Sequence, residues 1–224
     1  MAVRSVKEAR SIAALRAVVR DWRAAGERVA LVPTMGALHS GHLALVERGF
    51  KEADRVVVSI FVNPTQFAPN EDFSKYPRTE EADLAALADV GADLAFLPQV
   101  VEMYPPGAAT TVSLSGPATV GLEDRFRPTH FAGVATIVAK LFCQALPDVA
   151  IFGEKDYQQL QVVTRMAADL DIPVDVIGHP TVRDADGLAL SSRNRYLSPE
   201  NRATAKVLPD TIRAAIDAMR VGTP

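Results

Sequence analysis

Two histidines, His39 and His42, are the residues of this chain whose type and spacing are best suited to chemistry. They lie in the glycine-containing segment 33–42, after the apolar run 29–32, which predicts a buried strand, and before residues 43–48, which predict the start of a helix. In an open α/β sheet, such a turn lies at the carboxyl edge of the strand, where ligands bind. Glycine lets the backbone approach a ligand closely, and the helix N-terminus offers free N–H groups to an anion. The segment therefore predicts a polyphosphate site.

The spacing of Gly36 and Gly41 resembles a Walker A loop, but His42 and Leu43 follow where that loop requires Lys and Ser or Thr. A single histidine in such a turn would be interpreted as a cap or a surface residue. Two histidines in the pattern H-x-G-H, directly after a predicted strand, favour a functional role instead. The pattern resembles the H-x-G-H signature of the nucleotidylyltransferase superfamily, whose histidines contact the phosphates of ATP.

Three further polar clusters lie where strands or loops are predicted to end. The first supplies neutral amides, the second a lysine after a glycine turn, and the third two hydroxyls and a guanidinium. A lysine in the first turn of a helix opposes the helix dipole, so its position indicates a bound anion. Instead of a functional role, the first cluster could form a polar turn and the third could cap a helix. The clusters are Asn63 and Gln66; Gly153, Lys155, Asp156 and Gln159; Ser191, Ser192 and Arg193.

The elements that must position these side chains alternate between apolar strands and amphipathic helices. This alternation is typical of βαβ units and predicts an α/β fold with a Rossmann-like parallel sheet flanked by helices. We expect strands at 29–32, 56–62, 94–97, 149–152 and 174–177, and helices at 5–25, after His42, at 80–91, 133–145 and 156–170.

The pattern changes after Pro180, where residues 181–183 and 188–193 predict two short strands around an acidic turn. We therefore expect a domain boundary there, with one domain at 1–180 and a second, smaller one at 181–224.

The composition fits an enzyme of small molecules. The chain has 224 residues, of which 48% are hydrophobic and 23% charged, and its net charge of -3 gives no basic surface for nucleic acid. The longest apolar run predicted as a strand, 56–62, is far too short for a membrane span. No signal or transit peptide is indicated, so we expect a cytoplasmic protein. The single cysteine, Cys143, lies in an apolar stretch and is predicted to be a core residue.

Six segments together resemble the pantothenate synthetase family, the ATP-dependent pantoate:beta-alanine ligases. The resemblance extends from about Val29 to about Leu197, in the same order and at close spacing. The domain that follows in this family normally continues past Pro224, so residues 181–224 are expected to be the start of a lid domain. The segments are 33–42, 59–67, 76–79, Arg127-Pro128 with His130-Phe131, 152–160 and 186–194.

The resemblance implies two steps: pantoate attacks the α-phosphorus of ATP to give pantoyl adenylate and diphosphate, and beta-alanine then displaces AMP. It implies catalytic roles for His39, His42, Lys155, Ser191, Ser192 and Arg193. Further ATP contacts would come from Pro33, Thr34, Met35, Gly41, Gly153, Asp156, Val182 and Leu190, and pantoate contacts from Met35, Asn63, Gln66, His130, Phe152 and Gln159. Mg²⁺ would arrive with ATP, since the sequence shows no dedicated ligand cluster. A homodimer is the expected assembly.

Two alternatives remain open for the sequence alone. One is a related H-x-G-H nucleotidylyltransferase, which would require additional basic residues for a phosphate-bearing acceptor. The other is a non-catalytic nucleotide-binding module. Formation of AMP from ATP, pantoate and beta-alanine would separate all three.

Overall fold

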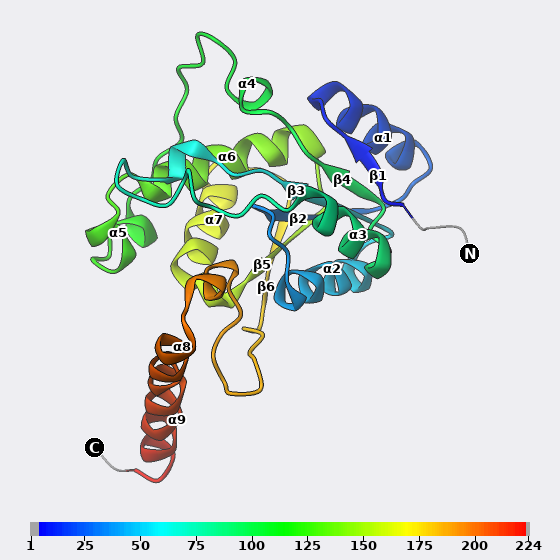
Figure 1. Ribbon diagram of the computed structural model, residues 1–224. Coiled ribbons are helices and arrows are strands. Elements are labelled where there is room, and N and C mark those ends of the chain that lie inside the picture. Colours follow the sequence, from blue (N-terminus) through cyan, green and yellow to red (C-terminus); the bar gives the residue numbers. More distant parts are fainter. Residues whose placement is uncertain (1–4, 223–224) are drawn as a thin grey trace.

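A computed structural model describes residues 5–222 and shows a parallel six-stranded sheet (Figure 1). The strand order is β1-β4-β3-β2-β5-β6. Central strands β2 and β3 pair in register along their whole length, with Val32 opposite Val58. The predicted α/β class is confirmed. The strands are β1 (Lys7–Ala9), β2 (Val29–Thr34), β3 (Arg55–Ile60), β4 (Leu94–Phe96), β5 (Val149–Gly153) and β6 (Asp175–His179).

Helices cover both faces of the sheet (Figure 1). Helices α1 (Ile12–Ala24), α6 (His130–Ala145) and α7 (Tyr157–Asp169) pack with Val29 and Leu31 of β2 in one core. Helices α2 (Ser40–Glu52) and α3 (Glu80–Val90) pack with Ala30 and Val32 in the other. Successive side chains of a strand point to opposite faces, so burial of both faces explains why β2 is a continuous apolar run.

The predicted helix at 5–25 is wrong in its first part. Residues Lys7–Ala9 form β1, which pairs in parallel with β4 at the edge of the sheet. Ser11 then caps α1, and its hydroxyl accepts a hydrogen bond from the Ala14 amide at 3.2 Å. Pairing with a strand more than 80 residues away has no local signature, whereas the capping serine is visible in the sequence.

The other helices follow the predicted pattern, with shifts at their ends. Helix α3 ends at Gly91, which has a φ of +86°, as expected for a glycine C-cap. Helix α6 begins three residues earlier than predicted, and a 3₁₀ turn, η3 (Glu154–Asp156), precedes α7. Short elements that the sequence did not predict are η1 (Pro64–Gln66), α4 (Val100–Met103), η2 (Gly116–Ala118) and α5 (Glu123–Phe126).

The segment after Pro180 contains fewer strands than predicted. Its two expected strands are reduced to one antiparallel bridge between Arg183 and Ala189. A 3₁₀ helix, η4 (Ser192–Tyr196), follows, and then α8 (Pro199–Ala205) and α9 (Val207–Arg220). Figure 1 shows α9 projecting away from the sheet. Across residues 5–222, no helix combines the length and the apolar character that crossing a membrane demands.

Cys143 is exposed, so its prediction as a core residue is wrong. It lies on α6, most of whose side chains are buried, but the helix keeps a narrow solvent-facing stripe. Lys140, three residues earlier and on the same side of the helix, is only partly buried. An apolar stretch in the sequence therefore concealed one exposed position.

Candidate active site

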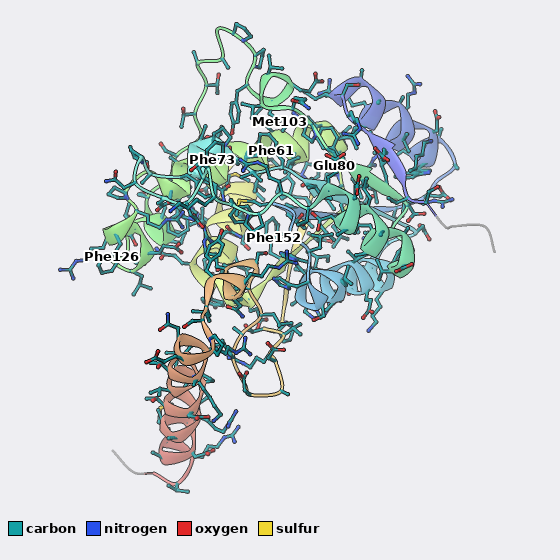
Figure 2. The ribbon with its side chains drawn as sticks, in the orientation of Figure 1. Phe61, Phe73, Glu80, Met103, Phe126 and Phe152 are labelled. Carbon is teal, nitrogen blue, oxygen red and sulfur yellow. The ribbon has the colours of Figure 1, made fainter. Side chains whose placement is uncertain are left out.

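One pocket opens at the carboxyl ends of β2, β3 and β5, the edge at which ligands bind in open α/β sheets. Every residue that the sequence predicted for the site lines it, from Pro33 in β2 to Arg193 in η4. The pocket also contains residues that the sequence analysis did not assign, among them Ser59, Tyr76 and His179. In Figure 2, Phe152 lies near the centre of the molecule, whereas Phe126 of α5 lies at its outer edge.

The loop between β2 and α2 brings the two histidines together. His39 is the N-cap of α2 and His42 lies in its first turn, with their ring centroids 4.0 Å apart. The His39 backbone N–H donates to Nδ1 of His42 at 3.4 Å. A Cβ at Gly41 would lie 2.9 Å from two ring atoms of His39. Position 41 therefore requires glycine so that His39 can turn into the pocket.

The pocket favours the neutral form of both imidazoles. Burial, followed by the neighbouring His39 and Lys155, lowers the pKa of His42 to about 3. Burial and the charges of Lys155 and Arg195 lower the pKa of His39. Because Nδ1 of His42 accepts the His39 amide, the ring proton of neutral His42 is assigned to Nε2. His42 can therefore donate a hydrogen bond to an anion without carrying charge itself.

The lowered pKa of His42 predicts a pH dependence of stability. An unfolded histidine binds a proton near pH 6.5, whereas folded His42 does so only near pH 3. Between these two values the unfolded chain holds a proton that folded His42 lacks. The contribution of this site to the free energy of unfolding is therefore fully present above pH 6.5 and is lost as the pH falls toward 3. We therefore expect the free energy of unfolding, measured by urea titration, to fall less steeply from pH 7.5 to pH 5 in His42→Asn than in the unmodified chain. The slope that remains would come from His39 and His130, whose pKa values are also lowered. Equal slopes would contradict the assignment.

Lys155 brings a positive charge to the same side of the pocket. It lies in η3, directly after β5 ends at Gly153, and its Nζ pairs with Asp156 Oδ1 at 3.0 Å. Its side chain is more than one-third exposed, so this pair is readily rearranged. The cation and two neutral imidazole groups together form a surface suited to phosphate oxygens.

The third predicted cluster is engaged with two different loops. Ser191 caps η4 by accepting the Arg193 amide, as the helix-cap alternative predicted, and Ser192 Oγ donates to the carbonyl of Ala37 at 3.0 Å. Arg193 forms a two-point ion pair with Asp72 at 2.9 Å and lies over the Tyr76 ring. The guanidinium lowers the pKa of the Asp72 carboxyl. Arg193 therefore lines the pocket while tied to the segment after η1.

Neutral amides line the other half of the pocket. Asn63 is 1% exposed and its amide donates to Gln66 Oε1 at 3.0 Å and to the Gly133 carbonyl at 3.1 Å. Its Oδ1 accepts from Thr65 and Tyr104, so Asn63 is satisfied within the protein and shapes the wall. In the part of the chain that the structure describes, the one acceptor for Nε2 of Gln66 is the weakly accepting sulfur of Met35, at 3.2 Å. Of these two amides, Gln66 is thus the one that retains a donor for a ligand.

His130 is supported by an ion-pair network that sequence reasoning missed. Its Nδ1 donates to the Gln66 carbonyl at 2.9 Å, while Arg127 lies 3.3 Å from Nε2. Arg127 is itself paired with Glu71 and Glu123. Burial is the largest cause that lowers the pKa of His130. Glu71 lies in a loop and Glu123 begins the short helix α5, and neither has a recognisable sequence pattern, so only the folded arrangement shows this network.

The fold and the pocket together define an α/β enzyme of the Rossmann-like type with an H-x-G-H loop at its ligand edge. The sequence matches the pantoate-beta-alanine ligase family over residues 7–222. The chain belongs to this family, which confirms the resemblance seen in its motifs. It is a ligase that joins pantoate to beta-alanine.

Similar proteins agree in sequence and in structure. Pantothenate synthetase from Paramagnetospirillum magneticum is 62% identical over 213 residues, covering 95% of this chain and 75% of the relative. The Caulobacter vibrioides enzyme is 60% identical, covering 96% and 75%. The crystal structure of pantothenate synthetase from Thermus thermophilus matches with a TM-score of 0.92 at 53% identity, covering 97% of this chain and 77% of that one.

A second solved structure carries ligands. It is the pantoate-beta-alanine ligase from Francisella tularensis complexed with beta-gamma ATP and beta-alanine, with a TM-score of 0.87 at 36% identity. The match covers 93% of this chain and 80% of that one. The chain thus spans about three quarters of the length of the relatives it matches.

Proposed function

We propose that this chain carries out the ligation in two steps at the single pocket, through a pantoyl adenylate formed from ATP. The observation that supports this most is the division of the pocket into two halves. His39, His42 and Lys155 form a half suited to phosphates, and Gln66 and Gln159 line a half suited to a small hydroxy acid. ATP as a substrate is supported by the ATP complex of the Francisella tularensis ligase.

In the first step, the pantoate carboxylate attacks the α-phosphorus of ATP in line with the bond to the leaving diphosphate. A carboxylate oxygen gains the bond to phosphorus, and the bridging oxygen leaves with diphosphate. The protein needs to supply no nucleophile, so its contribution is positioning and stabilisation of charge on phosphate oxygens. Nε2–H of His42 and Nζ of Lys155 are the donors proposed for that charge.

In the second step, the free amine of beta-alanine attacks the acyl carbon of the adenylate. The amide bond forms as the bond between that carbon and the AMP oxygen breaks, and the one proton that the amine loses passes to solvent. In this scheme, the amide-lined half holds the acyl group in place during both steps, so a single pocket serves the whole reaction.

The remaining contacts follow from the family resemblance, and every residue concerned lines the pocket. We assign ATP to Pro33, Thr34, Met35, His39, Gly41, His42, Gly153, Lys155, Asp156, Val182, Leu190, Ser191, Ser192 and Arg193. Pantoate is assigned to Met35, Gln66, His130, Phe152 and Gln159, with Asn63 shaping the wall behind Gln66.

Magnesium would be held by the phosphate oxygens of ATP and by water. Mg²⁺ prefers oxygen ligands and usually keeps several waters, so the triphosphate is its proposed carrier. When bound, the ion would offset the charge of the leaving diphosphate.

We further propose two domains, 1–180 and 181–224, and a homodimer acting in the cytoplasm, where ATP is available. The bend of the chain after β6 and the projection of α9 support the boundary near Pro180 (Figure 1).

Isotope exchange tests the stepwise scheme. We expect labelled diphosphate to exchange into ATP when pantoate is present and beta-alanine is absent, because adenylate formation is reversible without the amine. The control omits pantoate and should show no exchange. Exchange that strictly requires beta-alanine would overturn the proposed adenylate intermediate. Transfer of AMP to a phosphate-bearing acceptor would favour the nucleotidylyltransferase alternative. ATP binding without formation of AMP would favour the non-catalytic nucleotide-binding module.

A further inference from the structure

A buried carboxylate lies beneath the histidine loop although it is far from that loop in the sequence. Asp83, on α3, is 2% exposed. Its Oδ2 accepts the backbone N–H of Ala37 at 2.9 Å, and its Oδ1 accepts the N–H of Leu38 at 2.8 Å. The hydroxyl of Thr79 donates to Oδ1 at 3.1 Å. Three donors therefore satisfy a carboxylate that is closed off from solvent.

The turn that Asp83 holds has a disfavoured backbone conformation. Gly36 has a φ of +80°, and Ala37, the next residue, has a φ of +50°. Positive φ is costly for a residue with a Cβ, so the surroundings must hold Ala37 in place. Ala37 is fully buried and is fixed from both sides, because its N–H donates to Asp83 and its carbonyl accepts from Ser192.

This turn determines where the histidines lie. Leu38, whose amide Asp83 accepts, directly precedes His39, the N-cap of α2. A rotation of the 37–38 backbone would turn His39 and move the start of the helix that carries His42. Asp83 is thus connected to His39 through the adjacent residue Leu38, and to His42 through the start of α2.

We propose that Asp83 is a positioning residue for the reaction: its buried carboxylate fixes the Gly36–Leu38 turn and through it the placement of His39 and His42 toward the phosphates. This inference depends on the proposed roles of the two histidines. A role for Asp83 as a metal ligand is not favoured, because both of its oxygens already accept hydrogen bonds from the protein.

The variant Asp83→Asn tests this with little change of volume. An amide has one accepting oxygen and one donating nitrogen, so in either orientation one backbone N–H of the turn faces a donor and loses its partner. We expect kcat to fall about 10- to 100-fold, the scale of a small misplacement of catalytic groups, with the KM for pantoate nearly unchanged. The matched control is Asp89→Asn, an exposed aspartate on the same helix, which should leave kcat unchanged.

The imidazole NMR signals provide a readout that a loss of overall stability would not produce. The chain has four histidines. In folded Asp83→Asn, the signals of His39 and His42 should shift, while those of His130 and His179 should stay in place. If Asp83→Asn does not fold, Gly36→Ala provides the same test, since its Cβ would lie 3.0 Å from Asp83 Oδ2 and strain the same turn.

The outcomes separate this inference from the proposed function. A lower melting temperature with unchanged kcat and unshifted His39 and His42 signals would overturn the positioning role. A raised requirement for Mg²⁺ in Asp83→Asn, with unshifted imidazoles, would overturn it in favour of a metal role. If His42→Ala itself leaves kcat unchanged, the proposed role of the histidines fails, whatever Asp83→Asn does.

Discussion

Lys155→Ala is expected to lower kcat by roughly 10²- to 10³-fold, the scale seen when one preorganised donor to developing charge is removed. Within residues 5–222, Lys155 pairs with Asp156 alone, and its side chain is more than one-third exposed, so little folding energy depends on it. Its charge lies close enough to lower the pKa of both His39 and His42. Steady-state kinetics with ATP and pantoate varied separately measure the effect, and thermal unfolding checks the fold.

His42→Ala should lower kcat by a similar factor, because the Nε2 donor disappears. The matched control is Lys51→Ala, an exposed lysine in the last turn of α2, which should have almost no effect. If Lys155→Ala altered only the KM for ATP, its contribution would be uniform binding, and the assignment of transition-state stabilisation would be wrong.

The parts of this molecule that sequence reasoning predicted are those with a local signature. The turn from Val32 to His42 combines an apolar run, glycines and paired histidines, and it forms the strand, loop and helix that the pattern indicated. Gly91 ends α3 as a left-handed cap for the same reason. Each of these depends on neighbours within a few residues, so the sequence alone carries the information.

The missed features depend on partners distant in the chain. Asp83 supports the histidine loop from 45 residues away, and Asp72 holds Arg193 from 121 residues away. An acidic residue in a helix or a loop has no pattern that distinguishes such a role from solvation. The edge strand β1 was missed likewise, since β4, the strand with which it pairs, lies more than 80 residues away.

The largest expected effect concerns the hydroxyl of the acid substrate. Pantoate lacking its 2-hydroxyl should react far more slowly than pantoate, because a desolvated amide would be left without a partner; such sites discriminate by up to about 10⁴-fold. We assign Gln66 to this hydroxyl, since among the described residues its Nε2 donates to the Met35 sulfur alone. Comparing kcat/KM for the two acids measures the discrimination.

Gln66→Leu should then lower kcat/KM for pantoate and narrow the gap between the two acids, because the donor that penalised the analogue is gone. Asn63 keeps its hydrogen bond to the Gly133 carbonyl, so the wall of the pocket should persist. The matched control is Gln161→Leu, an exposed position on α7, which should alter neither acid. ATP affinity should barely change in either variant. If Gln66→Leu weakened ATP binding and left the hydroxyl preference intact, Gln66 would belong to the nucleotide site, and the division of the pocket into a phosphate half and an amide-lined acid half would fail.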